Sequence, residues 1–161
     1  MKRSRVCVIG LGNLLLGDEG VGVHAVDLLA ARYTFTPSVD LVDGGTLGLD
    51  LLPFLEGRDR VLLIDAADFG RPPGHIGFLE SPELPATLFA RPSVHHIGLS
   101  DLLSAASLLG TRPSSLRLIG VQPLSLEPGI GLSGIIADRM EILIETVLDV
   151  LHEWHVTAAP K

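Results

Sequence analysis

Short apolar runs alternate with helical patterns in the first part of the chain. Three runs rich in β-branched residues end at glycine or an acidic residue: Val6–Gly10, Val39–Asp43 and Val61–Asp65. Behind the first run, apolar residues recur at helical spacing from Val21 to Leu29, and Pro37 prevents further extension of that helix. This β-α-β-α-β order predicts a parallel sheet with helices on both faces.

The rest of the chain continues the same alternation. Thr46 is suited to N-cap a short helix that ends at Leu55. Further strands are predicted at His75–Leu79, as a short edge strand, and at Leu116–Val121. Two more amphipathic helices follow from their apolar spacing, one from Leu99 to Leu109 and one whose buried stripe runs from Ile136 to Trp154. We therefore expect one α/β domain that spans residues 1–161.

Composition narrows the classes of function. The 161 residues carry a formal net charge of −7, and no cluster of Lys or Arg forms a stripe, which argues against a nucleic-acid partner. The longest stretch without a charged residue, Val6–Gly17, is too short for insertion into a membrane, and it lacks the features of a signal peptide. We expect a cytoplasmic protein. Its single cysteine, Cys7, is expected to be a small buried residue.

Acidic residues follow each of the first three predicted strands. The first strand leads to Asp18 and Glu19, the second ends at Asp43, and the third ends at Asp65. Ligands of open α/β sheets bind beyond the carboxyl ends of the strands, near the point where the strand order reverses. The topology therefore predicts that these carboxylates converge. Two carboxylates about 6 Å apart repel each other by roughly 3 kcal/mol, so the cluster requires a cation, a shared proton or a cationic side chain.

The glycines of the first loop favour a different ligand. Gly12 and Gly17 have the spacing of a phosphate-binding loop, but Asp18 and Glu19 stand where a Lys and a Ser or Thr are expected. A phosphate would add to the repulsion. A cation site could also use His95 or His96, because two carboxylates and an imidazole suit nickel, zinc or cobalt.

Structural roles are the alternatives for the same residues. Asp43 could cap the helix after Thr46 or its own turn. Asp18 is better suited than Glu19 to cap the helix that follows, because its short side chain reaches backbone N–H groups. The two histidines could equally be structural.

Five segments in series resemble the hydrogenase maturation endopeptidase family. They are GLGNLLLGDEGVG, VDGGTLGLDLL, LLIDAAD, SVHHIGLSDLL and GVQPLSLEPGIGLS, and they cover nearly the whole chain. The resemblance implies a three-layer sandwich, in which helices cover both faces of a twisted, mostly parallel five-stranded sheet. It also implies an endopeptidase that removes a C-terminal extension from the large-subunit precursor of a nickel–iron hydrogenase after nickel insertion.

The resemblance further assigns residues. The metal-contacting positions fall on Glu19, Asp65 and His95, and Asp43 matches a further acidic position linked to recognition or activity. Nickel would be supplied by the nickel-loaded precursor, with no organic cofactor. Two other functions use the same residues without proteolysis: a nickel chaperone or metal sensor would use the three metal positions, and a small nucleotide-binding protein would use the glycines.

Overall fold

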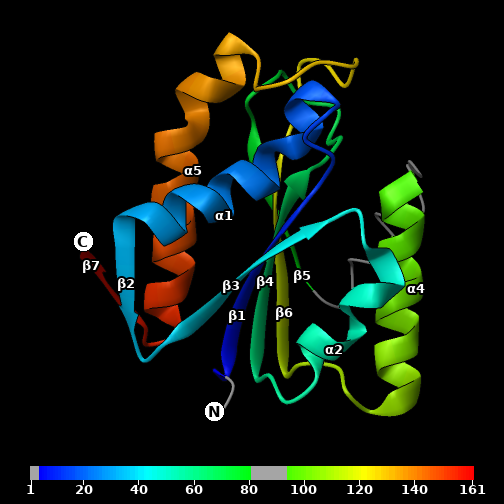
Figure 1. Ribbon diagram of the computed structural model, residues 1–161, viewed down its shortest axis with the longest axis vertical. Coiled ribbons are helices and arrows are strands. Elements are labelled where there is room, and N and C mark those ends of the chain that lie inside the picture. Colours follow the sequence, from blue (N-terminus) through cyan, green and yellow to red (C-terminus); the bar gives the residue numbers. More distant parts are fainter. Residues whose placement is uncertain (1–3, 81–93) are drawn as a thin grey trace.

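The central sheet has five strands in a computed structural model that describes residues 4–80 and 94–161, apart from the side chains of residues 94–99 (Figure 1). The strands are β1 (Val6–Leu11), β3 (Val39–Gly45), β4 (Arg60–Ala66), β5 (Ile76–Glu80) and β6 (Ser115–Val121). Their order is β3-β1-β4-β6-β5, and only β5 runs antiparallel to its neighbour. The mostly parallel sheet is confirmed.

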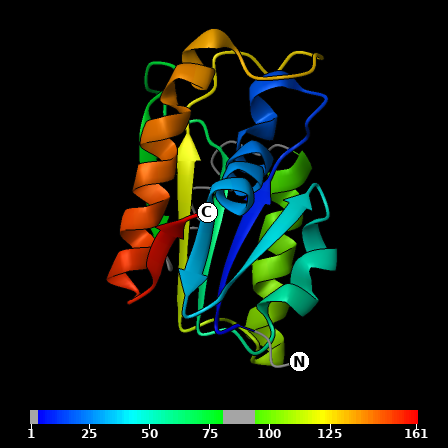
Figure 2. The ribbon, with the colours of Figure 1, turned by 60° about the vertical axis from the view of Figure 1, so that its left-hand side comes forward.

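Helices cover both faces of the sheet, as expected. One face carries α1 (Val21–Arg32) and α5 (Gly134–Glu153), and the other carries η2 (Gly48–Leu51), α2 (Leu52–Leu55) and α4 (Val94–Leu109). Figure 2 shows α1 and α5 together in front of the sheet and α4 behind it. Alternation along β1 fills both cores, because Val8 packs with the first pair of helices whereas Cys7 and Ile9 pack with the second group. Cys7 is fully buried, as predicted.

A second, two-stranded sheet was not predicted. It pairs β2 (Tyr33–Thr36), which follows α1 directly, with β7 (Thr157–Pro160) near the C-terminus. The pairing is antiparallel, and it ties the end of α1 to the segment that follows α5.

Two local expectations were wrong. Thr46 does not cap a helix, because the chain turns at Gly44–Leu47 and the first helical turn begins only at Gly48, without a side-chain cap. The fully buried stripe of the last helix ends at Leu151, and Trp154 lies just beyond the helix, where it is half-buried against the same core.

Candidate functional site

The strand order reverses between β1 and β4, and the candidate site lies beyond the carboxyl ends of these strands, at the top of Figure 1. Gly10 of β1 is level with Asp43 of β3 on one side and with Ile64 of β4 on the other. Asp65 is the next residue of β4. The register therefore brings two of the four predicted site residues to the same edge of the sheet.

Glycines allow the following loop and helix to lie directly on these strand ends. A Cβ atom on Gly22, in the first turn of α1, would lie 2.0 Å from the Ile64 carbonyl oxygen. A Cβ atom on Gly12 would lie 1.7 Å from the Glu19 carbonyl oxygen, and Gly12 has a φ of +123°. These contacts require glycine. They hold η1 (Gly17–Gly20), which carries Glu19, in contact with β4.

Glu19 and Asp65 thus come from adjacent elements but differ in burial. The Asp65 side chain is fully buried, and its Oδ1 accepts a hydrogen bond of 2.8 Å from the Ala66 N–H. Glu19 is half-buried. Because burial penalises a charged carboxylate, a cation that approached this pair would offset part of the cost of burying Asp65.

Asp43 is exposed at the end of β3. Its Oδ1 accepts a hydrogen bond of 3.0 Å from the Gly45 N–H, so it caps its own turn, one of the two structural roles considered from the sequence. The Gly12 N–H donates to the Gly45 carbonyl at 2.9 Å, which links this turn to the loop after β1. An exposed carboxylate in a fixed turn remains accessible to a substrate.

Asp18 has a role that the sequence did not suggest. It was expected to cap α1, but the residue at that cap is Gly20, and no side chain bonds there. Asp18 is buried, and its carboxylate instead binds the loop between β6 and α5. It accepts hydrogen bonds from the N–H groups of Leu124, Ser125 and Ser133 and from the Ser133 hydroxyl, at 2.7–3.2 Å. Contacts across more than a hundred residues carry no local sequence signal.

Backbone hydrogen bonds join the same two loops. Gly17 donates to the Gly129 carbonyl at 3.0 Å, and Gly129 donates to the Leu15 carbonyl at 2.9 Å. The loops that surround the strand ends also expose large apolar side chains, which we call the apolar rim: Leu14, Leu15, Leu47, Leu49, Leu124, Leu126 and Ile130. Such a concentration of exposed apolar side chains is typical of a surface that binds another protein.

His95 lies in the first turn of α4, because this helix begins at Val94 and not, as predicted, at Leu99. Its side chain, like that of His96, is outside the described residues. Among the side chains that are described, no three His, Cys, Asp or Glu residues gather closely enough to hold a metal ion. The set of Glu19, Asp65 and His95 therefore stays a prediction. No helix in the described part of the chain has the length and apolarity needed to cross a membrane.

Comparisons with known proteins identify the family. The family model described as hydrogenase maturation protease matches residues 23–150. The chain is 40% identical to the hydrogenase 2 maturation protease of Escherichia coli over 158 residues, which is 98% of this chain and 96% of the relative. It is 41% identical to the hydrogenase expression/formation protein HupD of Bradyrhizobium diazoefficiens, covering 97% of this chain and 82% of the relative.

Solved structures agree with this result. The structure of the hydrogenase maturating endopeptidase HybD from E. coli superimposes with a TM-score of 0.93 at 40% identity, covering 98% of both chains. The similarity thus extends over the sheet, both helical layers and the loops of the candidate site. The chain belongs to the hydrogenase maturation protease family and is a peptidase that acts in hydrogenase maturation.

Proposed function

We propose that this peptidase removes the C-terminal extension of a nickel–iron hydrogenase large-subunit precursor after nickel has been inserted. The main support is the similarity to the E. coli maturation protease over 98% of the chain, together with acidic residues at the reversal of strand order. The apolar rim around these residues suits a protein substrate better than a small molecule.

In this proposal nickel is part of the substrate. Glu19, Asp65 and His95 contact the nickel ion that the precursor carries, so that only a loaded precursor is held in position for cutting. Two carboxylates and one imidazole are a reasonable ligand set for nickel. The ion would polarise the carbonyl of the bond that is cut. Asp43, which is exposed at the end of β3, would accept a proton from the attacking water.

The direct test incubates the purified protein with nickel-loaded and nickel-free precursor and measures the mass of the precursor. We expect loss of the extension only from the loaded form. If both forms stay intact, the protein is not the protease of this precursor, and the proposed function fails. Equal cutting of both forms would contradict recognition through nickel.

Variants test the assigned residues. Glu19→Gln, Asp65→Asn and His95→Ala should each slow the cutting by roughly 100-fold or more, while circular dichroism and thermal unfolding stay close to those of the wild type. His96→Ala is the matched control and should cut normally. If His96→Ala is inactive and His95→Ala is active, the assignment of the imidazole is wrong.

A further inference from the structure

The outer edge of β3 offers backbone groups to another strand. In the described part of the chain, β3 is the first strand of the sheet and pairs with β1 alone. Edge strands are usually protected by Pro, by charged side chains or by a short length. The strand VDLVDGG is seven residues long and contains no Pro, and of its two charged residues Asp40 is paired with Arg58, while Asp43 lies in the turn at its end. The edge is therefore chemically able to accept an additional strand.

A groove follows this edge. It has a volume of about 620 Å³ and lies beside the candidate site rather than in it. Its floor is Ser38–Val42, and its walls come from both faces of the sheet. Ala30, Tyr33 and Phe35 contribute one wall, and Phe54 and Arg58 contribute the other. Such a groove can receive the backbone of an extended peptide and the side chains on both of its faces.

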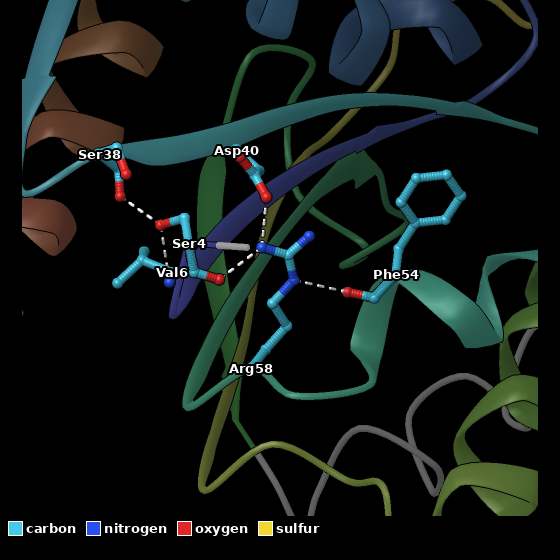
Figure 3. A network of polar contacts seen from close by, with 6 residues as sticks. All are labelled: Ser4, Val6, Ser38, Asp40, Phe54 and Arg58. Carbon is cyan, nitrogen blue, oxygen red and sulfur yellow. Dashed lines mark hydrogen bonds and ion pairs between the residues drawn. The ribbon is translucent and has the colours of Figure 1, made fainter. Parts of the chain in front are cut away.

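A buried arginine fixes the second wall. The Arg58 side chain is 2% exposed, and its guanidinium donates hydrogen bonds to the carboxylate of Asp40 and to the carbonyls of Ser4 and Phe54 (Figure 3). Ser4 also holds the residue before β3, because its hydroxyl donates a hydrogen bond to the Ser38 carbonyl. The positive charge of Arg58 offsets the negative charge of Asp40, and the contacts keep the β3 edge in an extended conformation. The backbone of this edge therefore loses little conformational freedom when a peptide binds.

The direction of β3 connects the groove with the candidate site. Val42 lines the groove, and Asp43 is the next residue. A polypeptide that pairs with β3 is therefore led to the strand end at which Asp43 and Asp65 lie. A folded domain is too large for the groove, whereas an extended segment attached to one fits it.

We propose that the groove along β3 binds the C-terminal extension of the precursor as an added strand of the sheet. This inference rests on the proposed function. The extension pairs through its backbone with the outer edge of β3, and its alternate side chains contact the two walls. Affinity comes largely from main-chain hydrogen bonds, so the site tolerates sequence changes in the extension but requires the extension to be extended.

Protein variants test whether the groove is used. Ala30 and Ala31 are both exposed in α1, but only Ala30 lines the groove. We expect Ala30→Trp to raise the KM for the nickel-loaded precursor roughly tenfold with kcat little changed, since binding is obstructed but the site is intact. Ala31→Trp, which adds the same side chain outside the groove, should have the kinetics of the wild type. Equal kinetics for the two variants would overturn the proposal.

Peptide probes test the pairing itself. Two synthetic copies of the extension carry N-methyl groups at complementary sets of alternate residues. In an added strand only one set of N–H groups faces β3, so one peptide should bind at least about tenfold more weakly than the other by calorimetry. If the two N-methylated peptides bind equally well, or if neither of them binds, strand addition is contradicted.

Two further results separate the proposals. If the wild type does not cut the loaded precursor, the proposed function fails, whatever the peptides do. If it cuts but the groove variant behaves as the control does, only the strand addition fails. A concentration-dependent dimer that Ala30→Trp abolishes would assign the groove to a second copy of this chain and overturn the proposal.

Discussion

The two ends of the parallel strands stabilise their charges in different ways. At the amino end, charges are matched by opposite charges. Arg5 and Asp59, which precede β1 and β4, form an ion pair of 2.5 Å, and the buried Arg58 guanidinium pairs with Asp40. In both of these pairs the negative charge is matched by a positive charge of the same chain.

At the carboxyl end, carboxylates are held by hydrogen bonds. Asp18 accepts from backbone N–H groups and a hydroxyl, and Asp43 accepts from a backbone N–H. In the part of the chain that the structure describes, neither forms an ion pair with Lys or Arg. N–H donors stabilise a carboxylate without cancelling its charge. The comparison shows how this fold fixes Asp18 and Asp43 in place while their negative charges stay uncancelled at the end that carries the candidate site.

The largest effect on folding is expected where the carboxyl end depends on close packing. In Gly22→Ala the new methyl group would overlap the Ile64 carbonyl, so the free energy of unfolding should fall by about 3 kcal/mol or more. Gly134→Ala is the control, because this helical glycine has open space around its Cβ position, and its effect should stay within about 1 kcal/mol. Denaturant unfolding measures both. If Gly22→Ala lowers the free energy of unfolding only slightly, the strand ends and α1 can move apart easily.

An intermediate effect is expected at Asp18. The Asp18→Asn variant replaces one acceptor oxygen with a donor that faces the N–H groups of the 122–133 loop. We expect a loss of about 2–3 kcal/mol in the free energy of unfolding. Ser133→Ala removes a single hydroxyl bond and should cost about 1 kcal/mol. If both variants lower the free energy of unfolding by the same amount, the Asp18 carboxylate contributes no more than one ordinary hydrogen bond. The contrast between the amino and carboxyl ends of the strands is then weaker.

The smallest effect is expected at the exposed pair of the amino end. The hydrogen bond from Arg5 holds the pKa of Asp59 below its ordinary value of 3.8. A lowered folded-state pKa contributes stability above pH 3.8 that is lost as the pH falls through the folded pKa. The melting temperature of the wild type should therefore slightly exceed that of Asp59→Asn at neutral pH. The difference should shrink as the pH falls below 3.8. A difference that persists in acid would show that it does not come from the ion pair.

Local patterns predicted the main sheet because its strands are dense in apolar, β-branched residues. The second sheet was missed because β7, with the sequence TAAP, has weak strand propensity and becomes a strand only by pairing with β2. Topology correctly brought Asp43 and Asp65 to one end, since that depends only on strand direction and order. The position of Asp18 depends on a loop more than a hundred residues away, and the sequence around it resembled an ordinary helix cap.

The pairing of Asp18 with the 122–133 loop has a consequence for how such sequences can diverge. The loop contains little regular structure of its own, and a single carboxylate near the other end of the chain accepts four of the hydrogen bonds that fix its shape. A substitution at Asp18 would require a compensating change in the loop, and a new loop would require a partner at position 18. Residue 18 and the 122–133 loop are therefore expected to change together in evolution. A designer who transfers the loop to another member of the fold must transfer both.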